Sequence, residues 1–93
     1  MRTEERFVGS AEVSCGERVI FASAIYKLTV FWDGSAQGEL RAPHGEQLTP
    51  LIARGDDNWL HLKLDDGRLV VFQVRRADAS AGRWGDIEGR VAM

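Results

Sequence analysis

The chain has little of the residues from which covalent or metal-centred sites are built. It contains one cysteine, Cys15, and two histidines, His44 and His61, among 93 residues. A single thiol forms no internal disulfide and no thiolate metal cage, since such a cage needs two to four cysteines. The aspartates form no D-x-D-x-D loop followed by a glutamate, which is the usual calcium pattern. We therefore expect no metal site and no cofactor.

Long apolar runs are also missing. No stretch approaches the ~20 apolar residues of a membrane-spanning helix. The start, residues 1–6, carries acids where a signal peptide needs positive charge, and no apolar segment follows it. Together with the lone cysteine, this predicts a cytoplasmic protein with no membrane partner, unless a leader has been removed.

An excess of basic residues is absent. Twelve Lys and Arg face fourteen Asp and Glu, for a formal net charge of −2, and the isoelectric point is about 5.6. Proteins that bind nucleic acid usually carry a basic excess, because neutralising phosphates releases counterions and supplies much of the affinity. Nucleic acid is therefore an unlikely partner on composition.

Motifs of known catalytic or nucleotide-binding chemistry are absent as well. The sequence has no G-x-S-x-G, H-E-x-x-H, G-x-G-x-x-G or G-K-[ST]. His44 lies in a Pro-Gly loop, where a solvated imidazole is the simplest interpretation. We predict no catalytic residue, and the sequence indicates an architecture more clearly than an activity.

Alternation with a period of two is the strongest signal present. From residue 18 to 32 the even positions are all apolar: Ile20, Ala22, Ala24, Tyr26, Leu28, Val30 and Trp32. This pattern is typical of a half-buried β-strand. Fifteen residues are long for one strand, so we expect a bend near residues 22–24, where the side chains are small.

Six further segments alternate or are apolar between turn signals. They are residues 6–14, 36–42, 48–54, 59–64, 68–76 and 85–91. Pro50 cannot donate to a sheet, so we place residues 48–54 at an edge or bulge. The pattern predicts one all-β domain over residues 1–93, a small antiparallel barrel or barrel-like sandwich of about seven strands with short hairpin turns. Residues 1–5 are expected to be loosely attached, and residues 77–82 to be the most mobile loop.

The clearest hairpin joins residues 59–64 to 68–76 through Asp65-Asp66-Gly67. A three-residue loop with left-handed Gly67 sets Leu62 opposite Val70 and Leu60 opposite Phe72, which gathers the apolar side chains on one face. Glycines fall at inward positions of other strands, namely Gly9, Gly38 and Gly89. They favour a tightly curved barrel in which they make room for large neighbours, Tyr26 and Trp32.

The second face of this hairpin is mixed where a solvent face should be polar. It carries Trp59, His61, Lys63, Leu69, Val71 and Gln73. A residual apolar face indicates contact with another chain, a ligand or a second sheet. We take Trp59 as the anchor, since aromatic residues dominate interface energetics. The candidate binding residues are Trp59, His61, Lys63, Val71, Gln73, Arg75 and Phe31.

Three functions remain open. The first is a non-catalytic binding or oligomerisation module whose partner is itself, another protein or a small apolar ligand. The second is a small-barrel binder of single-stranded nucleic acid, which would use Phe31, Trp59, Lys27, Lys63, Arg75 and Arg76. The third is a small enzyme with a cavity site, for which Glu12, Glu39 and His61 are the groups to check.

Overall fold

The computed structural model describes residues 4–78 and 83–92 of the chain. Its elements are β1 (Glu4–Cys15), β2 (Arg18–Phe31), β3 (Ser35–Arg41), a short 3-10 helix η1 (Thr49–Leu51), β4 (Leu60–Lys63), β5 (Leu69–Ala77) and β6 (Trp84–Ala92). Glu4 and Glu5, expected in a loose N-terminus, belong to β1. The mobile loop predicted at residues 77–82 lies largely outside the described residues.

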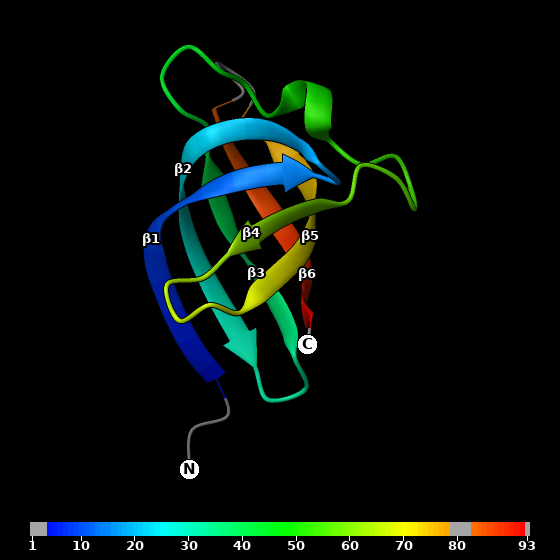
Figure 1. The fold of residues 1–93 in the computed structure, drawn as a ribbon. Helices are drawn as coiled ribbons and strands as arrows, with labels where there is room; N and C mark the ends of the chain where they lie inside the picture. Colours follow the sequence, from blue (N-terminus) through cyan, green and yellow to red (C-terminus); the bar gives the residue numbers. More distant parts are fainter. Residues whose placement is uncertain (1–3, 79–82, 93) are drawn as a thin grey trace.

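The strands form one closed antiparallel barrel in the order β1-β2-β3-β6-β5-β4 (Figure 1). The predicted all-β barrel is therefore confirmed, with six strands where about seven were expected, and it is not a sandwich. The wall closes between β1 and β4 through only two residue pairs, Val13 with Leu62 and Ser14 with His61. This short seam has the fewest residue pairs of any strand pair in the barrel.

The predicted bend in β2 is present as a break in its pairing with β1. Ala11 pairs with Ala24 and Val13 with Phe21, so β2 has one residue more than β1 across this step. The extra residue forms a β-bulge, which shifts the alternation by one, so that inward and outward positions are exchanged at Phe21 and Ala22. Phe21, expected outside, is buried in the core, and Ala22, expected inside, is exposed.

Trp32 also departs from the expected pattern. Its side chain is 83% exposed, because β2 ends at Phe31 and Trp32 begins the turn to β3. The expectation that Trp32 fills the barrel is therefore wrong. From Ala24 to Val30 the alternation is as predicted, and Ala24, Tyr26, Leu28 and Val30 are all buried.

The β4–β5 hairpin has the predicted register. Leu60 pairs with Phe72 and Leu62 with Val70. Gly67 has a φ of 94°, and the loop is closed by hydrogen bonds between Leu64 and Arg68 and from Gly67 to Leu64. The inward side chains of the hairpin, Leu60, Leu62, Leu64, Val70, Phe72 and Val74, are at most 2% exposed.

The segment at residues 48–54 is not a strand, and that prediction is wrong. Leu48 is buried in the core, and η1 follows it with Pro50 in its first turn. Proline has a fixed φ and no N–H, so it suits the start of a helical turn better than a sheet. Ile52 keeps a single parallel bridge to Val74, which ties the segment to β5.

The inward glycines mark close approach between strands. A methyl group on Gly9 would lie 3.0 Å from the Tyr26 hydroxyl, so Gly9 makes room for Tyr26 as predicted. Gly38 and Gly89 instead face neighbouring backbone, and a methyl group would lie 2.9 Å from Leu28 Cα and 2.6 Å from Phe72 Cα respectively. These approaches let the strands curl tightly around a small core.

Candidate functional site

The outer surface of the β4–β5 hairpin gathers the main candidate residues. We call this surface the hairpin face, and it consists of Trp59, His61, Lys63, Leu69 and Val71. His61 pairs with Val71 across the two strands, and Lys63 pairs with Leu69. Trp59 and Leu69 are 39% and 37% exposed, and His61 and Val71 are half-buried. The face therefore presents apolar area with one cation at its rim.

Trp59 precedes β4 and is fixed from one side. Its indole N–H donates to the Asp56 carboxylate over 2.7 Å. Because that bond satisfies the only polar group of the ring, the remaining ring surface is free to make apolar contacts. A pre-oriented aromatic ring loses little conformational freedom on binding, which is the property of a good anchor.

A hollow of about 440 Å³ borders the hairpin face, along the short seam where β1 pairs with β4. Glu12 and Ser14 of β1 line it on one side, and His61, Lys63 and Leu69 line it on the other. It opens to solvent, and its lining includes an acidic residue, Glu12, and a basic residue, Lys63. The seam therefore extends the hairpin face onto β1.

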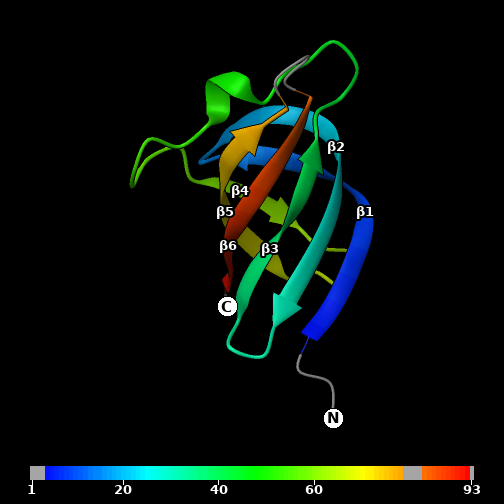
Figure 2. The same ribbon diagram turned by 180° about the vertical axis from the view of Figure 1, so that it is seen from behind.

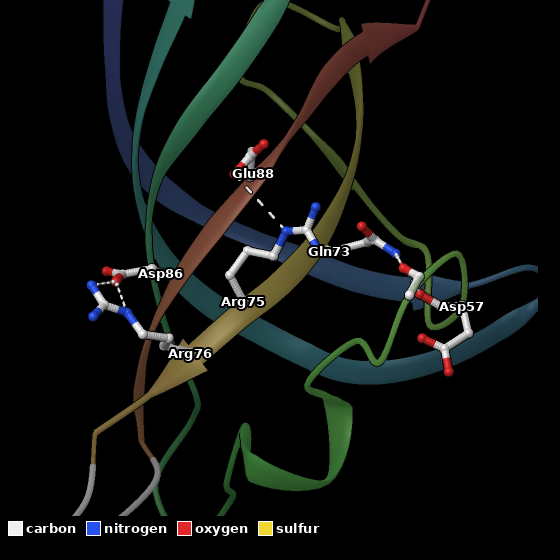
Figure 3. Close-up of polar contacts among 7 residues, drawn as sticks. Asp57, Gln73, Arg75, Arg76, Asp86 and Glu88 are labelled. Atoms are coloured by element: carbon white, nitrogen blue, oxygen red, sulfur yellow. Dashed lines mark hydrogen bonds and ion pairs between the residues drawn. The ribbon is translucent and has the colours of Figure 1, made fainter.

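Gln73 is separated from this surface. It is 2% exposed, because residues 55–57 of the loop before β4 lie over it (Figure 3). Its side-chain amide donates to the carbonyl oxygens of Gly55 and Asp57 over 2.6 and 2.8 Å. The structure thus gives Gln73 a part in holding this loop on β5.

The other two candidates lie apart from the hairpin face. The Arg75 guanidinium is 3.9 Å from the Glu88 carboxylate, and on the same side Arg76 binds Asp86 at 2.7 and 3.0 Å (Figure 3). Phe31 ends β2, which is adjacent to neither β4 nor β5 in the strand order. The set of candidate binding residues predicted from the sequence therefore includes residues from different sides of the barrel.

The loop at the tip of the β4–β5 hairpin lies beside β1, as both ribbon views show (Figures 1 and 2). The Arg68 guanidinium lies 4.9 Å from the centre of the Phe7 ring and 3.6 Å from the Glu5 carboxylate. These contacts cover the part of β1 that pairs with no strand on this side, and an uncovered edge would invite aggregation. The stretch of the β1 edge around Glu5 and Phe7 is thus covered, whereas Glu12 and Ser14 further along the strand line the open seam hollow.

Behind this tip lies the buried hydroxyl of Tyr26. It lies close to Asp65, at the tip of the hairpin. Burial raises the pKa of the Tyr26 phenol above its ordinary value, and the nearby Asp65 carboxylate raises it further. The phenol therefore stays protonated across the physiological range.

The groups considered for catalysis are only partly brought together. Glu12 and His61 line the same hollow, whereas Glu39 lies exposed on β3 with Lys27 and Asp86 as its cross-strand neighbours. Sequence reasoning missed Ser14 and Arg90, which flank His61 and Val71 in the sheet. Their places follow from the strand order, which no local pattern specifies.

Comparison with known proteins found no family model, no curated protein and no solved structure that matches this chain. Within residues 4–78 and 83–92, no group of three or more His, Cys, Asp and Glu side chains is placed to hold a metal ion. No helix in the same part of the chain is long and apolar enough to cross a membrane.

Proposed function

We propose that this protein is a non-catalytic association module, and that its hairpin face binds a second copy of the chain. The observation that carries this proposal is the exposure of Leu69 on β5 and of Trp59 directly before β4, together with half-buried Val71. Apolar residues grouped on a small surface indicate an interface more often than scattered ones do.

The charges around the face suit a second copy. Glu12 of β1 and Lys63 of β4 both line the seam hollow. On β6, which pairs with β5, the acidic Glu88 and the basic Arg90 lie two residues apart. An interface between identical chains brings one surface against itself, so it must be self-complementary. A face with both signs around an apolar centre can meet its copy without net repulsion.

The alternatives find less support. The nucleic-acid candidates Arg75 and Arg76 lie beside Glu88 and Asp86, which offset their charge. The barrel interior is filled by large side chains such as Tyr26 and Phe72, which leaves little space for an apolar ligand or a cavity-based active site. A different protein as the partner of the hairpin face is the closest rival.

The test is the mass of the protein in solution over a wide concentration range, by sedimentation velocity. We expect the wild type to sediment as a dimer at high concentration and to dissociate on dilution. The variant Leu69→Lys places a charge on an exposed apolar position of the face, opposite Lys63, and should remain monomeric. Trp59→Ala should weaken the dimer about tenfold or more, as expected for loss of an anchor.

The chain offers a matched control. Val8 is 67% exposed and pairs with Lys27 on β2, so Val8→Lys also sets a new lysine opposite an existing one. It should dimerise like the wild type. A wild type that stays monomeric throughout would overturn self-association, and Leu69→Lys dimerising normally would place the interface elsewhere.

A further inference from the structure

A second candidate site lies on strands other than the hairpin. A hollow of about 240 Å³ forms where β3 leaves the barrel, and it is lined by Ser23, Ile25, Arg41, His44 and Arg83 among others. The amide of Ala42 donates to the carbonyl of Arg83 over 2.8 Å, which fixes the two segments side by side. The position of the hollow is therefore set by the backbone.

The lining is basic on a chain whose net charge is negative. Arg41, Arg83 and His44 contribute to it, and none of the lining residues is acidic. In the described part of the chain the ion pairs involve Arg6, Arg68, Arg75 and Arg76, so neither Arg41 nor Arg83 has a carboxylate partner there. A hollow lined by two such arginines and a histidine, with no acid among its lining residues, favours an anion.

The surroundings hold these groups in place. The Arg41 guanidinium lies 5.0 Å from the centre of the Trp84 ring, which supports one face of the group and leaves its edge free to donate. The backbone of Trp84 is held in turn by Asp78: the Asp78 amide donates to the Trp84 carbonyl over 2.7 Å, and the Trp84 amide donates to the Asp78 carboxylate over 2.9 Å. His44 lies in a turn closed from Glu46 to Pro43, with Gly45 at a φ of 85°.

Three acids line the neighbouring surface, and a fourth, Glu46, lies exposed in the turn that holds His44. Glu39, Asp78 and Asp86 line another hollow together with Arg76, which binds Asp86. Glu39 also has Lys27 opposite it on β2. The three acids of the neighbouring surface thus have cations or backbone donors of their own.

We propose that this hollow binds a phosphate group, free or as the monoester of a small molecule. A guanidinium matches two phosphate oxygens with two parallel N–H groups, and two such groups with an imidazole can surround a tetrahedral oxyanion. The volume is below the usual range of ligand pockets, about 300–1,000 Å³, so it suits one small group and not a large ligand. The site does not depend on the function proposed for the hairpin face.

The test is a titration of the amide and indole signals of the protein by NMR, at constant ionic strength. One arm uses inorganic phosphate and the other glycerol 3-phosphate. We expect saturable shifts of the amide signals of Arg41, Ala42, His44, Arg83 and Trp84 and of the Trp84 indole signal. The arm with the higher affinity identifies whether the free ion or the monoester is the natural source of the group.

Two variants and a control make the result specific. Arg41→Gln and Arg83→Gln should each weaken binding about tenfold or more, because each removes a charge-assisted contact. Arg18→Gln alters another exposed arginine, at the start of β2, and should bind like the wild type. Linear, unsaturated shifts spread over all basic residues, or equal affinity in Arg41→Gln, Arg83→Gln and Arg18→Gln, would overturn the proposal.

Discussion

At the scale of single residues, side chains that break the local pattern carry the most information. Gln73 is a polar residue in an apolar strand, and the sequence placed it on the open face of the hairpin. Its burial depends on the loop before β4, in which the contacted Gly55 lies eighteen residues earlier in the chain. Alternation within the strand places Gln73 on the outer face of the sheet. It carries no information about a loop elsewhere in the chain that covers this face.

Gln73 therefore allows a prediction about stability. The variant Gln73→Glu keeps the size of the side chain but replaces two amide donors with acceptors that face carbonyl oxygens. We expect the free energy of unfolding to fall by about 1–3 kcal/mol at neutral pH, as measured by urea denaturation. Gln47→Glu, at an exposed loop position, should change it little. Equal stability of the two variants would mean that the loop does not rest on Gln73.

At the scale of elements, the sequence predicts those turns and hairpins whose conformation depends on residues close together in the chain. Asp-Gly turns, alternation and small residues are local signals, and they specified the β4–β5 register and the bend in β2. Residues 48–54 failed because an apolar stretch fits a strand or a buried turn equally well. The contact of Leu48 with the core and the geometry of Pro50 decided between them.

The β2–β3 turn carries a prediction about pH. Asp33 accepts hydrogen bonds from the hydroxyl and the amide of Ser35, at 2.6 and 2.9 Å, and these bonds lower the pKa of its carboxyl. Ser35→Ala should bring that pKa back toward the ordinary value, measured by NMR titration of the Asp33 carboxyl. An unchanged pKa would show that the hydroxyl bond is not formed.

The sign of the effect on stability follows from the same shift. A carboxyl whose pKa is lower in the folded state stabilises the fold above its ordinary pKa, and this stabilisation is lost as the pH falls through the lowered value. The stability advantage of the wild type over Asp33→Ala should therefore shrink in acid. Urea denaturation of both proteins at neutral pH and at successively lower pH values checks this expectation.

At the scale of the whole molecule, closure of the barrel brings distant segments together. The seam hollow combines β1 with β4, and the basic hollow combines the ends of β3 and β6. Alternation indicated a barrel, but the pairing of β3 with β6 and of β1 with β4 depends on long-range packing. Both candidate surfaces therefore become visible only with the strand order.

The central claim is that the hairpin face meets its own copy, and intermolecular NOE measurements test it most directly. A mixture of isotope-labelled and unlabelled chains reports only contacts between copies. We predict such NOEs from the methyl groups of Leu69 and Val71, and none from those of Val8. If the dimer forms without NOEs from Leu69 and Val71, or if the NOEs arise from another face, the account is contradicted.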